Sequence, residues 1–99
     1  MRVIAGSARG RRLKTLEGMD VRPTTDKVKE AIFSAIQFDL PDAAVLDLFA
    51  GSGQMGIEAL SRGAASVVFV DRSARSLQVT RENLDTGING LSRKENSPI

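Results

Sequence analysis

Two short apolar segments separated by a helical pattern dominate the middle of the chain. Residues 44–49 (AVLDLF) predict a first parallel strand. Residues 66–71 (SVVFVD) predict a second, whose nearly unbroken apolar run is typical of a strand covered on both faces. Between them, residues 53–62 have the spacing of a crossover helix that Gly63 ends, and a further helix closes at Gly87. Strand, helix and strand at this spacing predict a right-handed βαβ unit.

Helical periodicity also indicates which positions of these two helices face the core. Apolar side chains recur at the spacing of one helix face, with one polar threonine among them. These positions are Met55, Ala59, Leu60, Ala74, Leu77, Thr80 and Leu84.

Two further elements precede this unit. Residues 1–14 predict a short β-hairpin around a Gly-Ser-Ala-Arg-Gly turn. Pro23 is well placed at a helix start, with Thr24 or Thr25 as the cap, and the helix should stop near Phe38. Its spacing predicts one apolar stripe, formed by Val28, Ala31, Ile32, Ala35 and Ile36. The charged positions assigned to its other faces are Lys27, Lys29 and Glu30.

The last residues of the chain break this pattern. From about residue 90 the sequence is polar and shows no strand periodicity. Two parallel strands do not complete a doubly wound sheet, which usually has about five or more. We therefore expect an α/β fold with three parts: a basic hairpin and connection over residues 1–22, a partial Rossmann-like sheet over residues 23–89, and a polar tail over residues 90–99. This organisation suggests the front part of a longer domain.

Charge is distributed unevenly along the 99 residues. Residues 1–29 contain eight Lys/Arg and three acidic residues, a net +5, whereas the rest contains six and nine, a net −3. A basic N-terminal part on an acidic body favours an anionic partner such as nucleic acid, although a solvated surface would have the same composition. The absence of cysteine and histidine excludes thiolate zinc sites, cysteine nucleophiles and histidine bases. The sequence contains no secretory h-region and no apolar run of membrane-spanning length, so we expect a cytoplasmic location.

A glycine loop at the end of the first strand carries the clearest chemistry. Asp47 precedes the sequence GSGQMG, in which Gly51, Gly53 and Gly56 form a G-x-G-x-x-G pattern that opens a helix. A dinucleotide would bring a pyrophosphate here, and a carboxylate about 5 Å away would cost roughly 3 kcal/mol. S-adenosylmethionine carries an ammonium and a sulfonium, which the carboxylate would attract. The residues thus favour a methyl-donor pocket, although the glycines could serve only tight strand–helix packing and Asp47 could be a satisfied strand-end carboxylate.

Asp71 lies twenty residues beyond Gly51, at the tip of the second strand. An acid there can accept hydrogen bonds from both ribose hydroxyls of an adenosine. The alternative is that Asp71 caps the helix that follows, and the two roles are compatible. Of the four phenylalanines we expect Phe33, Phe38 and Phe69 in the core, and only Phe49 near a ligand.

Arginines provide candidate phosphate contacts. Arg9, Arg11 and Arg12 occupy the turn and second half of the predicted hairpin, where they would track the backbone of a nucleic acid without reading its sequence. Arg22 precedes a rigid proline near the positive end of a helix, which supports a phosphate contact only weakly.

Three segments together resemble the bacterial family of small-subunit (16S) ribosomal RNA guanine-N2 methyltransferases. They are RVIAGSARGRRL, RPTTDKVKEAIFSAI and VLDLFAGSGQMGIEALSRGAASVVFVD, and the resemblance runs from Arg2 to about Asn89. It implies an S-adenosylmethionine-dependent enzyme without a metal, whose partner is 16S rRNA or the small ribosomal subunit. The donor-binding set that we expect is Asp47, Phe49, Ala50, Gly51, Ser52, Gly53, Asp71 and Arg72. The RNA-binding set is Arg9, Arg11, Arg12 and Arg22.

The sequence departs from this family in one serious respect. Amino-directed methyltransferases of this kind use an Asp/Asn-Pro-Pro-aromatic motif, whereas the prolines here are only Pro23, Pro41 and Pro98. We therefore assign no catalytic residue and expect the chain to be inactive alone. Two other functions stay open: a dinucleotide-binding Rossmann domain, against which Asp47 argues, and a non-enzymatic RNA-binding fragment.

Overall fold

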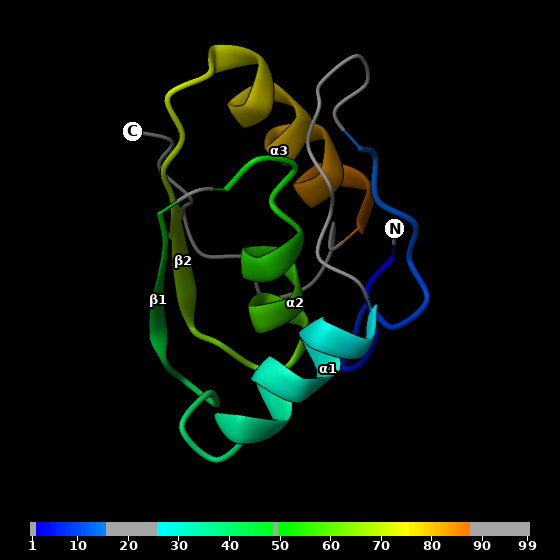
Figure 1. The fold of residues 1–99 in the computed structure, drawn as a ribbon, viewed down its shortest axis with the longest axis vertical. Helices are drawn as coiled ribbons and strands as arrows, with labels where there is room; N and C mark the ends of the chain where they lie inside the picture. Colours follow the sequence, from blue (N-terminus) through cyan, green and yellow to red (C-terminus); the bar gives the residue numbers. More distant parts are fainter. Residues whose placement is uncertain (1, 16–25, 49, 88–99) are drawn as a thin grey trace.

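The computed structural model describes residues 2–15, 26–48 and 50–87 (Figure 1). In chain order, the elements within these ranges are α1 (Asp26–Ala35), β1 (Ala44–Asp47), α2 (Gln54–Ser61), β2 (Ser66–Phe69) and α3 (Ala74–Gly87). β1, α2 and β2 form the predicted βαβ unit, and α3 follows it as expected. The predicted helix start around Pro23 lies outside the described residues, as does the tail over residues 90–99.

β1 and β2 form a two-stranded parallel sheet in which Ala44 pairs with Ser66 and Asp47 with Phe69. Both strands end two residues earlier than predicted. Contact between the two segments nevertheless continues, because the Val70 N–H donates to the carbonyl of Asp47 at 2.8 Å and the Ala50 N–H donates to the carbonyl of Val70 at 3.0 Å. The carboxyl ends of both strands therefore meet at one edge, where the glycine loop begins.

Helix α2 is buried almost all round. All of its residues except Met55, which is partly buried, are buried. The face of α2 that packs against the sheet comes close to β2 at Gly56, where an added Cβ would lie 2.3 Å from Cε1 of Phe69. Gly56 thus serves helix–sheet packing, as the packing alternative for the glycine motif requires at this position.

The N-terminal segment, residues 2–15, lies on the side of α2 away from the sheet (Figure 1). Its apolar side chains Val3, Ala8 and Leu13 are buried in the main core. The predicted hairpin is reduced to one antiparallel bridge, between Arg2 and Arg12. The segment is therefore fixed mainly by its contacts with α2 and not by a strand ladder of its own.

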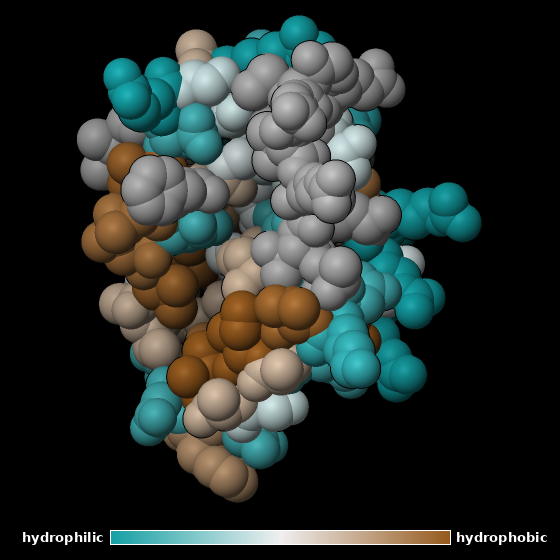
Figure 2. Space-filling model, in the orientation of Figure 1, coloured by the Kyte–Doolittle hydropathy of each residue, from teal (hydrophilic) through white to brown (hydrophobic). Residues whose placement is uncertain are grey.

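The predicted orientation of α1 is wrong. Its buried residues are Lys29 and Phe33, whereas Val28, Ile32 and Ile36 of the expected apolar stripe are 49%, 41% and 39% exposed. Lys29 can be buried because its ammonium donates to the carbonyl of Arg2 at 2.7 Å and lies 3.5 Å from a carboxylate oxygen of Glu58. Figure 2 shows the resulting apolar surface over α1 and β1.

Other differences from the predictions are local. The helix α1 ends at Ala35 and a turn follows, so Phe38 is 91% exposed and does not belong to the core. In α3, Leu84 and Thr80 are buried and Leu77 is partly buried, but Ala74 is exposed in the first turn. No helix within the described ranges is long and apolar enough to cross a membrane.

Candidate functional site

The loop between β1 and α2 forms the centre of the candidate site. Gly53, its last residue, has a φ of +84°, which favours glycine, and a Cβ there would lie 2.7 Å from Cγ2 of Thr80. Asp47 is half-buried at the start of the loop and accepts a hydrogen bond from the Gly56 N–H at 3.2 Å. This hydrogen bond uses part of the accepting capacity of the Asp47 carboxylate, as expected if Asp47 were only a satisfied acid at the end of a strand. It also fixes the carboxylate against the first turn of α2.

Asp71 closes the loop from the other strand. One of its oxygens accepts the Gly51 N–H at 2.9 Å, and the other accepts the Ser73 N–H, also at 2.9 Å. The cap of α3 is Ser73, whose hydroxyl accepts the Ser76 N–H at 3.2 Å. Asp71 therefore does not cap α3 itself; it positions the capping residue and the glycine loop together.

Helix α3 holds the other side of the same loop. The Thr80 hydroxyl donates to the carbonyl of Gly51 at 2.9 Å, and Nδ2 of Asn83 donates to the carbonyl of Ser52 at 2.8 Å. Thr80 and Asn83 are both buried, with 2% and 0% of their surfaces exposed. The loop backbone is thus fixed before any ligand binds, an arrangement that lowers the cost of binding one.

The structure brings most of the predicted donor-binding residues to one place. Ala50, Ser52 and Gly53 are buried in the loop and Gly51 is half-buried, whereas Arg72 is exposed. Phe49 lies outside the described residues. Two carboxylates, from Asp47 and Asp71, flank the glycine loop, and a negative charge at Asp47 would attract a cationic group and repel a pyrophosphate.

A buried polar atom at the start of α2 gives a second indication of a ligand. The side chain of Gln54 is 8% exposed, and its Oε1 has no hydrogen-bond partner among the described residues. An unsatisfied buried acceptor costs about 1–3 kcal/mol, which a ligand donor would recover.

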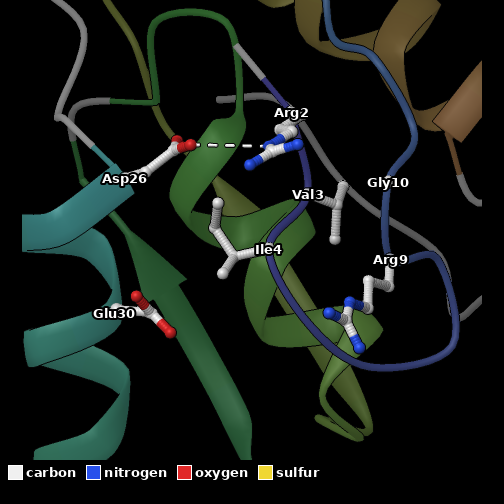
Figure 3. A pocket seen from close by; sticks show the side chains of 7 residues that line it. All are labelled: Arg2, Val3, Ile4, Arg9, Gly10, Asp26 and Glu30. Atoms are coloured by element: carbon white, nitrogen blue, oxygen red, sulfur yellow. Dashed lines mark ion pairs between the residues drawn. The ribbon is translucent and has the colours of Figure 1, made fainter.

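Three of the four predicted RNA-binding arginines lie on the N-terminal segment. Arg9, Arg11 and Arg12 are all exposed, and Arg22 lies outside the described residues. Arg9 and Arg2 line a cavity of about 260 Å³ between this segment and α1 (Figure 3). Asp26 and Glu30 line the same cavity from α1, and Asp26 forms an ion pair with Arg2 at 3.5 Å. These acids offset the positive charge at that cavity, which Arg11 and Arg12 do not line.

A buried polar cluster that sequence reasoning missed attaches the N-terminal segment to α2. Glu58, fully buried, accepts the N–H groups of Ile4 and Ala5 at 2.8 and 3.0 Å and forms ion pairs with Lys29 and Arg62. Ser61 accepts the Ala8 N–H and donates to the carbonyl of Ala5. Polar residues on a helix are ordinarily assigned to its solvent face, so periodicity alone could not reveal this cluster. Within the described residues, no group of three or more metal-ligating side chains occurs.

Comparison with known proteins identifies relatives of the chain. The family model described as Conserved hypothetical protein 95 matches residues 1–96. A Bacillus subtilis protein provisionally named as an rRNA methyltransferase, YlbH, is 55% identical over 86 residues, which are 87% of this chain and 47% of that protein. Ribosomal RNA small subunit methyltransferase D of Escherichia coli is 41% identical over 97 residues, covering 98% of this chain and 49% of the enzyme.

A solved structure, the hypothetical protein TTHA0928 of Thermus thermophilus, superimposes with a TM-score of 0.81 at 31% identity. The superposition covers all of this chain and 56% of that protein. The chain spans about half the length of the curated relatives that it matches, and its fold is a partial Rossmann-like methyltransferase fold. The chain belongs to the family described as Conserved hypothetical protein 95, which is the family of small-subunit ribosomal RNA methyltransferases that its sequence resembles.

Proposed function

We propose that these residues form the donor-binding part of an S-adenosylmethionine-dependent methyltransferase that acts on guanine N2 of 16S ribosomal RNA. The observation that carries the proposal is the pair of carboxylates, Asp47 and Asp71, fixed on either side of a preformed glycine loop. When bound, S-adenosylmethionine would supply an electrophilic methyl group on a sulfonium.

The residues at the loop fit this donor in three respects. The Asp47 carboxylate would face its cationic amino acid part, and the Asp71 carboxylate, which still has lone pairs beyond its two backbone contacts, would accept the ribose hydroxyls. Gln54 Oε1 is a buried acceptor for a donor group of the ligand. Phe49 and Arg72 complete the proposed set.

The N-terminal segment would bind the RNA through Arg9, Arg11 and Arg12, and Arg22, which follows it in the sequence, would add a fourth contact. Its attachment to α2 through Glu58 and Ser61 would hold it at a fixed position relative to the donor loop. An enzyme with a ribosomal RNA substrate would act in the cytoplasm. Methyl transfer by this mechanism would require no metal. The target guanine amine must be held beside the methyl group, and a misplacement of about 1 Å can cost roughly a hundredfold in rate.

A labelled-methyl assay tests this function directly. Because the 99 residues contain no Asp/Asn-Pro-Pro-aromatic motif, we expect the purified chain to bind the donor and 16S rRNA but to transfer no label to small subunits. A full-length relative serves as the positive control. Turnover by the chain above background would show that its own residues hold the target amine. Failure to bind donor, with RNA binding retained, would instead favour the non-enzymatic RNA-binding function.

A further inference from the structure

Asn83 of α3 joins the glycine loop to the N-terminal segment. Its Nδ2 donates to the carbonyl of Ser52 at 2.8 Å and to the carbonyl of Lys14 at 3.0 Å, and its Oδ1 accepts the Lys14 N–H at 2.7 Å. Ser52 belongs to the proposed donor loop, and Lys14 follows the proposed RNA-binding arginines by two residues. One fully buried side chain therefore binds both functional segments.

The chemistry of this position admits few other residues. The side chain must accept one N–H and donate to two carbonyls, and a carboxamide does this with one oxygen and both amide hydrogens. An aspartate would keep the acceptor but turn a carboxylate oxygen towards two carbonyl oxygens in a buried site. Because the three bonds share one rigid group, a shift of the Lys14 backbone must move the side chain or break its bond to the loop.

We propose that Asn83 is a positioning residue that couples the RNA-binding segment to the donor loop: a ligand that restrains one of them further also restrains the other through this side chain, so that each ligand raises the affinity for the other. The functional half of this inference depends on the proposed function. The structural half does not, because the three hydrogen bonds exist without either ligand. A second contact of α3 with the loop, from the Thr80 hydroxyl to Gly51, does not include the N-terminal segment and provides a comparison.

Amide hydrogen exchange of the ligand-free chain tests the structural half. Asn83→Asp should lower the protection of the Gly53 amide, which donates to the carbonyl of Ala50 at 2.7 Å, by about tenfold. The Lys14 amide should keep its protection, because aspartate still accepts it. The Arg62 amide at the end of α2 provides the reference for global opening. Unchanged protection at Gly53, or an equal loss at Gly53 and Arg62, would contradict the inference. If the aspartate variant does not fold, Asn83→Ser, which is neutral and smaller, replaces it with the same expectation for Gly53.

Binding measurements test the functional half. S-adenosylhomocysteine should increase the affinity of the wild-type chain for 16S rRNA by about fivefold, within the usual range of coupling between sites. Asn83→Ser should reduce this factor to near one. Thr80→Val should weaken binding of S-adenosylhomocysteine but keep the factor. Glu82→Gln, which removes the exposed ion pair with the Lys14 ammonium, should change neither the affinity for S-adenosylhomocysteine nor the coupling factor.

The possible failures are distinguishable. A wild-type chain that binds only one ligand, or neither, contradicts the proposed function, and hydrogen exchange then decides the positioning role alone. A chain that binds both ligands independently, or an Asn83→Ser variant that keeps the coupling, contradicts the inference while the proposed function stands.

Discussion

At the scale of single residues, the candidate donor site depends on side chains that bind backbone groups. Asp71, Thr80 and Asn83 each hold the glycine loop through a hydrogen bond to Gly51 or Ser52. The residue types of Asp47 and Asp71 and their positions after apolar strands could be predicted from the sequence. Asn83 could not, because an isolated asparagine in a helix carries no signal of burial.

Replacement of Asp71 distinguishes a role in binding the ligand from a role in holding the glycine loop and the start of α3. Asp71→Ala should weaken binding of S-adenosylhomocysteine by roughly 1–3 kcal/mol, because charge-assisted hydrogen bonds to the ribose and to the loop are lost. The matched control is Ser73→Ala, which removes the cap of α3 and should lower stability by about 1 kcal/mol without the same loss of affinity. Titration calorimetry and urea unfolding measure the two quantities. If the Asp71 variant lost only stability, the acid would have a purely structural role.

Replacement of Glu58 tests the buried cluster. Glu58→Gln leaves the fully buried Lys29 ammonium and the Arg62 guanidinium without their shared counter-charge, so we expect a loss of about 3–5 kcal/mol in the free energy of unfolding. The double variant Lys29→Met/Glu58→Gln should recover part of that loss, because one unpaired charge is removed as well. Urea denaturation of the three proteins checks this, and a single variant as stable as the wild type would contradict it.

At the scale of elements, the βαβ unit follows from the sequence, whereas the direction that α1 faces does not. Apolar runs and a glycine loop specify β1, α2 and β2, and their bounds in the structure differ from the predicted ones by one or two residues. The apolar stripe of α1 suggested the buried face, but the structure buries Lys29 and Phe33. A contact between Lys29 and Glu58, distant in sequence, decided that orientation, and periodicity within a single helix cannot show such contacts.

The N-terminal segment gives a prediction about RNA binding. Replacing Arg9, Arg11 and Arg12 with alanine should weaken binding to 16S rRNA and reduce the slope of log affinity against log salt by about 2 to 3, since about that many phosphate contacts are lost. Arg75→Ala/Arg81→Ala, which changes exposed arginines of α3, is the control and should leave RNA binding nearly unchanged. Filter binding across a salt series measures both. An unchanged slope in the triple variant would mean that this segment is an ordinary solvated surface.

At the scale of the whole molecule, apolar side chains are exposed on α1, in the turn after it and along β1 and its end, and Figure 2 shows apolar surface over parts of α1 and β1. Its exposed side chains are Val28, Ile32, Ile36, Phe38, Leu46 and Leu48. The chain also spans about half the length of its curated relatives. Contiguous apolar surface of this kind ordinarily marks an interface or an association site.

The isolated chain should therefore associate with itself. Sedimentation velocity should show a concentration-dependent increase in mass, and the variant Ile32→Glu/Leu48→Glu should reduce it, because two charges then interrupt the apolar surface. Lys27→Gln, a change at a neighbouring exposed position, is the control and should behave as the wild type. A wild-type chain that stays monomeric up to its solubility limit would contradict this expectation.

The most direct test of the central claim is a comparison of two ligands at the glycine loop. Calorimetric titration of the wild-type chain should show that S-adenosylhomocysteine binds more tightly than NAD, because the carboxylate of Asp47 favours the cationic ammonium and opposes the pyrophosphate. Asp47→Asn should weaken the binding of S-adenosylhomocysteine and strengthen the binding of NAD, so that the two affinities become more similar. Tighter binding of NAD by the wild-type chain would contradict the assignment of this loop to a methyl donor.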